Sequence, residues 1–149
     1  MSIFSIATSG LSAASLRVNV AASNIANVNT TGPLPASGGS GTSDGAATSN
    51  IGPTFPAAYV PLRVDQASQS SGSTPGGTIA TVSAVSPSYT AQFDPSAPYA
   101  NQDGLVAAPN VDLANEFVQL ATAKYSFIAN AKVIQAYSET EKSLLDITT

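Results

Sequence analysis

The chain has 149 residues, the usual length of one domain, and a formal net charge of −4. It contains no Cys, which excludes disulfides and thiolate chemistry, and no His, which removes the commonest general base and metal ligand. Its five basic residues are scattered, so no basic patch for nucleic acid or anionic lipid is present. Only 9% of residues are charged, which suits either dense packing between subunits or a secreted protein of low charge.

A long first helix is predicted from about Ser2 or Ser5 to Asn27, with a length of about 35 Å. Its apolar residues follow a 4-3 spacing that defines a heptad seam: Phe4, Ala7, Leu11, Ala14, Val18, Ala21, Ile25 and Val28. Such a seam predicts that the helix lies along another helix. Gly10 interrupts the helix and indicates either a close helix approach or a local kink. The asparagines are predicted to face away from the seam or to cluster at the helix end: Asn19, Asn24, Asn27 and Asn29.

The helix is predicted to stop at residues 29–33, where poor helix formers precede Gly32, a residue suited to positive φ, and a proline. Leu34–Thr54 is rich in Gly, Ser and Thr and is predicted to be a linker, flexible or ordered only by neighbours. No run of 18 apolar residues occurs, so no membrane span is expected.

Alternating apolar residues predict a strand at residues 59–65, where Pro61 favours an edge position. A second strand is predicted at Thr78–Val85, and Tyr89, Ala91 and Phe93 extend its pattern. These strands suggest one long β-hairpin, which is marginal by itself and requires a surface to lie against.

A second long helix is predicted from Asn110 or Asp112, either of which can cap it, to Ile147. Its best heptad track is Leu113, Phe117, Leu120, Lys124, Phe127, Ala131, Ile134, Ser138, Glu141 and Leu145, and a second apolar stripe is Ala114, Val118, Ala121, Tyr125 and Ile128. Pairing with the first helix can bury only one of these faces, so we expect assembly to complete the fold. The alternative is that the second stripe packs on the β-hairpin of the same chain.

The predicted fold class is mainly α with a small β part. The N- and C-terminal helices form a coiled-coil domain, accompanied by a central long β-hairpin and an extended, partly flexible linker. The expected organisation is an N-terminal coiled-coil helix at 1–31, a linker at 32–56, a β-hairpin region at 57–93, an extended return segment at 94–111 and a C-terminal coiled-coil helix at 112–149.

No catalytic, cofactor-binding or metal site is predicted. The carboxylates of Asp94, Asp103 and Asp112 each stand in the sequence context of a turn or a helix cap. Ser9 lacks the flanking pattern of a nucleophile elbow, and the glycines at 38–41 lack the GK[ST] of a phosphate loop.

Both ends of the chain carry a sequence motif. The N-terminal motif consists of Ser9, Gly10, Leu11, Asn19, Asn24, Ile25, Ala26, Asn27, Asn29, Thr30, Thr31 and Gly32, and the C-terminal one includes Ala129 and Asn130. These motifs resemble those of bacterial flagellar rod and hook proteins. The segment before the last helix resembles that of the proximal-rod members, through Asp94, Pro95, Gly104, Pro109, Asn110 and Val111. The chain departs from the family at Ile128, where relatives carry an acidic residue, and at Leu34–Thr54, which has no clear counterpart.

The resemblance implies a structural subunit of the proximal rod, the hollow drive shaft that transmits torque and encloses the export channel. It implies export through the flagellar type III apparatus without a cleaved signal peptide, since the first positive charge is Arg17, and assembly in the periplasm. Expected partners are copies of the chain, other rod proteins, the membrane-ring base and the rod adaptor. The expected interface residues are Phe4, Leu11, Val18, Ile25, Leu113, Phe117, Leu120, Phe127 and Ile134.

Two rival hypotheses stay open on the sequence. The first is a truncated distal-rod or hook-type axial protein, against which the segment at residues 94–112 argues. The second is a small secreted binding module or enzyme that uses the Ser/Thr-rich middle of the chain.

Overall fold

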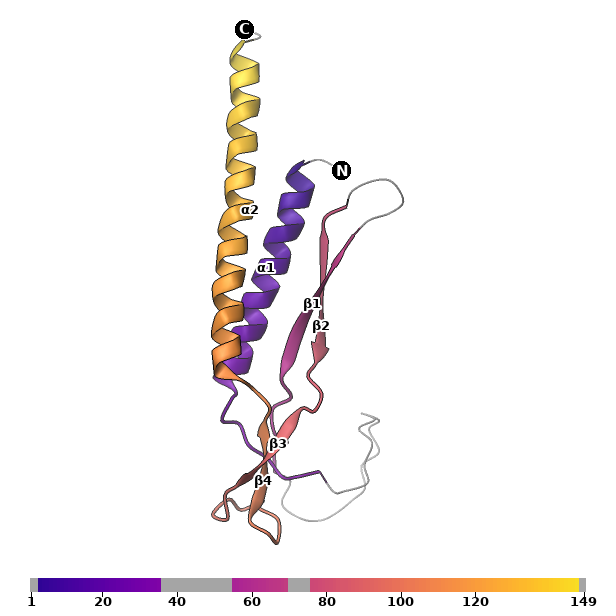
Figure 1. Cartoon of the computed structure of the whole chain (residues 1–149), viewed down its shortest axis with the longest axis vertical. Helices are drawn as coiled ribbons and strands as arrows, with labels where there is room; N and C mark the ends of the chain where they lie inside the picture. The colour runs from indigo at the N-terminus through magenta and orange to yellow at the C-terminus, as the bar shows by residue number, and fades with distance from the viewer. Residues whose placement is uncertain (1–2, 36–54, 70–75, 148–149) are drawn as a thin grey trace. The chain divides into compact units, whose positions relative to one another are not determined.

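The computed structural model of the chain describes residues 3–35, 55–69 and 76–147. Its elements in chain order are α1 (Ile3–Ala26), β1 (Leu62–Ser68), β2 (Thr78–Ala84), β3 (Tyr89–Phe93), β4 (Leu105–Pro109) and α2 (Leu113–Ile147) (Figure 1). The predicted fold class, mainly helical with a small β part, is confirmed. The chain divides into two compact units, one containing α1, α2, β1 and β2, the other containing β3, β4 and the segments 27–35 and 55–61.

In the first unit α1 lies between α2 and the β1–β2 hairpin (Figure 1). Helix α2 begins at a cap formed by Asp112, whose Oδ1 accepts hydrogen bonds from the backbone N–H of Ala114 at 2.9 Å and of Asn115 at 3.4 Å. These bonds satisfy N–H groups that have no partner within the helix. Of the two caps that the sequence offered, the structure therefore uses Asp112.

The two helices run antiparallel and meet through small residues. The buried apolar residues of the two helices are mostly alanines: Ala7, Ala13, Ala14 and Ala21 of α1, with Val20, and Ala123 of α2. A Cβ placed on Gly10 would lie 2.6 Å from Oδ1 of Asn130, so this glycine marks a close approach of the helices. Small residues let two backbones come together at the cost of apolar area, because an alanine buries little surface.

The β1–β2 hairpin is antiparallel and packs on α1. Its register runs from Leu62 opposite Ala84 to Ser68 opposite Thr78. The alternative that the hairpin covers the second apolar stripe of α2 is wrong, because the hairpin contacts α1 and the stripe is exposed. The exposed members of that stripe are Ala114, Val118, Ala121, Tyr125 and Ile128.

In the second unit β3 pairs with β4 in an antiparallel sheet of its own. The expected single long hairpin is therefore replaced by two short strand pairs, and Tyr89–Phe93 does not extend β2. Strand β4 falls within the predicted extended segment at 94–111.

Gly32 exchanges two backbone hydrogen bonds with Ala107, of 3.0 and 2.9 Å, instead of turning the chain through a positive φ. A Cβ on Gly32 would lie 2.8 Å from the backbone oxygen of Pro56, so close backbone approach is the reason that a glycine fits there. Within the described residues the glycine with positive φ is Gly104, at 73°.

Most of the predicted linker, residues 36–54, and part of the predicted hairpin tip, residues 70–75, lie outside the described residues. Neither of the two described helices has the combined length and apolar character that a bilayer crossing requires.

The contact between Gly10 and Asn130 predicts that the effect of Gly10→Ala on the free energy of unfolding reverses its sign when Asn130 is also replaced. Gly10→Ala removes a helix-destabilising glycine, worth about 1 kcal/mol, but forces its methyl group against the Asn130 amide, which also donates to the Ser126 carbonyl at 2.8 Å. We expect Gly10→Ala to destabilise the chain alone and to stabilise it in the Asn130→Ala background. Urea unfolding followed by far-UV circular dichroism measures both, and equal effects in the two backgrounds would contradict the close contact.

Candidate assembly surface

The predicted interface residues lie at the edge of the helix contact or outside it. Leu11, Val18 and Ile25 of α1 are half-buried beside the buried alanines, as are Leu120 and Ile134 of α2. The remaining four are exposed: Phe4, Leu113, Phe117 and Phe127. The structure contains one chain, so their contact with other subunits stays a prediction.

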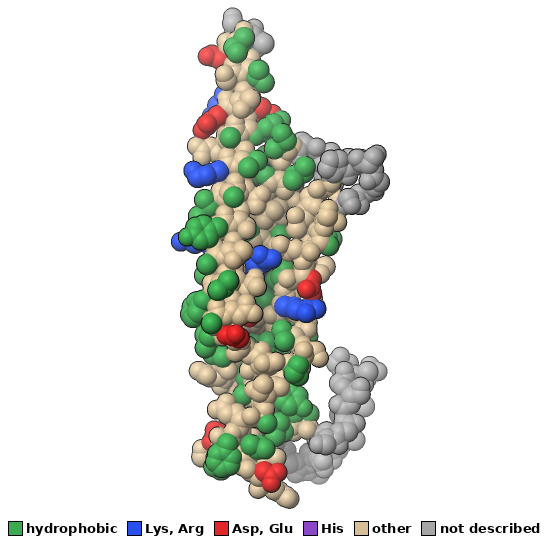
Figure 2. All heavy atoms as spheres, in the orientation of Figure 1, with side chains coloured by type: hydrophobic (Ala, Val, Ile, Leu, Met, Phe, Trp, Pro, Cys, Tyr) green, Lys and Arg blue, Asp and Glu red, His purple; other side chains and the backbone are tan. Residues whose placement is uncertain are grey.

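Helix α2 exposes large apolar side chains on the surface that α1 leaves uncovered (Figure 2). Tyr125 is 72% exposed, Val118 62% and Phe117 58%. An aromatic side chain buries about 150–250 Å² when it is fully covered. Covering the exposed part of one such ring therefore contributes roughly 2–3 kcal/mol. A contiguous surface of this kind marks an interaction site in most soluble proteins.

A buried asparagine joins three elements of the first unit. Asn24 is 1% exposed, and its Oδ1 accepts a hydrogen bond from the backbone N–H of Leu62 at 3.0 Å. Its Nδ2 donates to the Leu62 carbonyl at 2.7 Å and to Oε1 of Glu116 at 2.8 Å. One amide thus links α1 to the start of β1 and to the first turn of α2. Its full set of partners offsets the cost of burying a polar group.

Two further side chains on α1 hold the hairpin. Oγ of Ser9 accepts from the backbone N–H of Thr78 at 3.0 Å, and Nη2 of Arg17 donates to Oε1 of Gln66 at 3.0 Å. Together with Asn24 these residues form a polar stripe along α1. The hairpin is therefore attached largely by directional hydrogen bonds.

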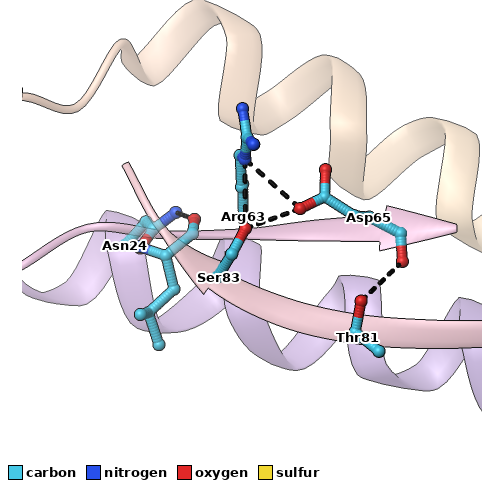
Figure 3. A network of polar contacts seen from close by, with 6 residues as sticks. Asn24, Arg63, Asp65, Thr81 and Ser83 are labelled. Atoms are coloured by element: carbon cyan, nitrogen blue, oxygen red, sulfur yellow. Dashed lines mark hydrogen bonds and ion pairs between the residues drawn. The ribbon is translucent and has the colours of Figure 1, made fainter. Parts of the chain in front are cut away.

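The outer face of the hairpin carries its own polar network (Figure 3). Oγ of Ser83 donates to Oδ2 of Asp65 at 2.6 Å and accepts from Nε of Arg63 at 3.1 Å. Arg63 and Asp65 also form an ion pair of 3.4 Å, in which both side chains are more than half exposed. Exposed pairs of this kind contribute little stability, so the network describes a solvated face.

The asparagines were predicted to face away from the seam or to cluster at the helix end, and Asn24 is buried on a track beside that seam. The sequence contained a signal for it, because Ala7, Gly10, Ala14, Arg17, Ala21 and Asn24 follow a second 3-4 track of small or polar residues. That track marks the face of closest approach, whereas the predicted seam followed the large apolar residues. The two tracks share Ala7, Ala14 and Ala21.

Several residues of the sequence motifs have structural roles in the second unit. The hydroxyl groups of Thr31 and Tyr99 lie 2.7 Å apart, and Nδ2 of Asn110 donates to the Pro87 carbonyl at 2.9 Å. Oδ1 of Asp94 accepts from the backbone N–H of Ser96 at 3.2 Å, which is the turn role expected for it. These contacts fasten the ends of the β segments.

The remaining carboxylates do not gather into a site. Asp103 lies in a turn where its backbone N–H donates to Oδ1 of Asn101 at 3.0 Å. The described residues contain no group of three or more His, Cys, Asp or Glu side chains placed to hold a metal ion. Ile128, the departure from the family pattern, is 41% exposed and adds to the apolar surface of α2.

Comparison with known proteins matches both ends of the chain. A family model described as flagella basal body rod protein matches residues 4–33, and one described as flagellar basal body rod FlgEFG protein C-terminal matches residues 102–147. The flagellar basal-body rod protein FlgC of Salmonella typhimurium is 35% identical over 136 residues, which are 90% of this chain and 87% of that protein. FlgC of Yersinia enterocolitica is 34% identical over 146 residues, covering 97% and 92%.

The Asn24 junction predicts that an amide cannot be replaced by an isosteric carboxylate. Asn24→Asp removes both donors, leaves the Leu62 carbonyl unpaired and sets a second negative charge against Glu116, so we expect a loss of about 3 kcal/mol in unfolding free energy. Adding Glu116→Gln restores a donor and should recover about half of the loss. The control Asn19→Asp, at an exposed position of the same helix, should cost less than about 0.5 kcal/mol. Urea titration measures all three, and equal losses at positions 19 and 24 would contradict the junction.

Proposed function

The chain belongs to the flagellar basal-body rod protein family, with FlgC proteins as relatives over nearly its whole length, and from this we propose that it is a structural subunit of the proximal rod. In this role it polymerises through its terminal helices into the hollow shaft that transmits torque and encloses the export channel. Its relatives are named as flagellar basal-body rod proteins, and the proposal assigns no catalytic step and no cofactor to the chain.

The observation that carries the proposal is the uncovered apolar surface of α2. Phe117, Val118 and Tyr125 are more than half exposed although they lie in a well-formed helix of 35 residues. Neither α1 nor the hairpin covers them. A subunit of a polymer has a simple reason to keep such a surface, because neighbouring subunits bury it.

The low charge of the chain supports the same role. Only 9% of residues are charged, and α2 presents few charges on the half that carries the exposed aromatic residues. Subunit contacts that are buried on several sides favour uncharged polar and apolar side chains, because each buried charge requires a partner.

We further propose that the partners are copies of the chain, the other rod proteins, the membrane-ring base and the rod adaptor. The site of assembly is the periplasmic part of the basal body, reached through the flagellar type III export apparatus. The FlgC relatives match along nearly their whole length, which favours a proximal-rod member over a truncated hook-type protein. The description of the C-terminal family model names FlgE, FlgF and FlgG.

The proposal predicts that a charge on the exposed surface of α2 abolishes motility without unfolding the chain. Phe117→Asp places a carboxylate where a neighbouring subunit is expected to bury a ring, and Leu11→Asp should act similarly at the edge of the helix pair. The control Gln119→Asp adds the same charge at an exposed polar position. Swimming in soft agar and the content of purified basal bodies measure the result. Normal swimming of the Phe117→Asp strain would count decisively against the proposal.

A further inference from the structure

Helix α2 extends well beyond its intrachain partner. Asn24 contacts Glu116 and Gly10 contacts Asn130, and each pair of positions on one helix is 14 residues apart, so the antiparallel register stays constant. Ile3, the start of α1, therefore lies level with about residue 137. Residues 138–147, which we call the overhang, project past α1, as Figure 1 shows.

The overhang is a helix without a covering element among the described residues. All of its side chains are exposed, including Leu144 at 60%, Leu145 at 71% and Ile147 at 79%. Within the helix, Gln135 donates to Glu139 at 2.9 Å, and a hydrogen bond to Glu141 raises the pKa of Tyr137. A single helix of this length is marginal in water, so the overhang requires a partner.

A second uncovered surface lies on the same helix at residues 124–133, which we call the middle segment. Tyr125 is 72% exposed, and Phe127, Ile128 and Val133 are each more than 40% exposed. The middle segment carries two lysines, Lys124 and Lys132, and no acidic residue.

The two surfaces are complementary in charge. The overhang contains three carboxylates, Glu139, Glu141 and Asp146, against one lysine, Lys142, so its net charge is −2. The middle segment has a net charge of +2. Glu139 and Asp146 are seven residues apart and share one face of the overhang, away from Leu144. Lys124 and Lys132 flank Ile128 on one face of the middle segment. Opposite charges on these two faces favour contact between the overhang and the middle segment and disfavour contact of either surface with itself.

Resting on the proposed function, we propose that the overhang of one copy packs on the middle segment of α2 in a second copy, with the two helices parallel and offset by about two heptads. The charges set this offset. It brings Glu139 of one copy beside Lys124 of the other, 15 positions earlier in the sequence, and Asp146 beside Lys132, 14 positions earlier. An offset of 14 residues corresponds to about 21 Å along the axis.

The overhang cannot pack on the middle segment of its own chain, because both surfaces belong to one continuous helix. It also uses different surfaces on the two partners, so each copy offers its overhang to one neighbour and its middle segment to another. Such a heterologous contact repeats without end unless its rotation closes a ring. The geometry therefore builds an open axial array.

The occupant of the overhang is a second copy rather than another part of the same chain. The residues outside the described ranges contain no lysine or arginine, and residues 36–54 contribute one charge, that of Asp44. They therefore offer no cationic side chain to the acidic overhang, whereas the middle segment offers two.

Cysteine cross-linking tests the offset directly, because the natural chain contains no Cys. In the Ile128→Cys/Lys142→Cys variant both thiols are exposed, lie on the two faces that carry the charge pairs, and are about 21 Å apart on one helix, far beyond disulfide reach within a chain. Cells that make only this variant, once oxidised, should yield a ladder of dimers and higher multimers from purified basal bodies. The Ala121→Cys/Lys142→Cys control uses the same faces but shifts the offset by one heptad, and it should yield none.

The outcomes separate this inference from the proposed function. A ladder from the control overturns the offset contact alone. The same conclusion follows if the test pair gives no ladder although its subunits are recovered in basal bodies and support swimming. Absence of the chain from basal bodies overturns the proposed function. As a second test, Lys132→Glu should reduce swimming to roughly a third, and Lys132→Glu/Asp146→Lys should restore most of it. Failure of the double variant to improve on the single one contradicts the pairing.

Discussion

The close approach of α1 and α2 through alanine and glycine is the constraint on which the rest of the structure depends. Ala7, Gly10, Ala21 and Ala123 bring the helices together in a defined register but bury little apolar area. Because small residues occupy this contact, the large ones are displaced to its edges and to the opposite face. The exposed rings of α2 thus follow from how the helix pair is built, and assembly is the event that covers them.

Heptad periodicity predicted both helices and their pairing, but it placed the contact one track away from where it lies. Leu11 and Val18 define the most apolar face of α1, and two helices considered alone would be expected to pack through this face. The structure instead uses the small-residue track that ends at Asn24. Size patterning within one helix does not reveal which neighbour covers each face, since that depends on residues such as Glu116 that are distant in sequence.

The β segments show the same limit. Alternation predicted strands at residues 59–65 and 78–85, and the structure has them at Leu62–Ser68 and Thr78–Ala84. The prediction succeeded because side chains in a half-exposed strand alternate every second residue. It could not predict that Tyr89–Phe93 pairs with Leu105–Pro109, since strand pairing is decided by tertiary contacts. Asn24 likewise escaped prediction, because its partners Leu62 and Glu116 come from two different elements. The family motifs were readable from the sequence, whereas the physical reason for each motif residue required the fold.

The central claim is that α2 is completed by neighbouring subunits and not by the rest of its own chain. Hydrogen–deuterium exchange along residues 113–147, compared between the dilute chain and purified basal bodies, tests it most directly. We expect rapid exchange of the dilute chain from about residue 138 onward, weak protection in the first half of the helix, and strong protection throughout in basal bodies. Equal, strong protection of the whole helix in the dilute chain would contradict the claim.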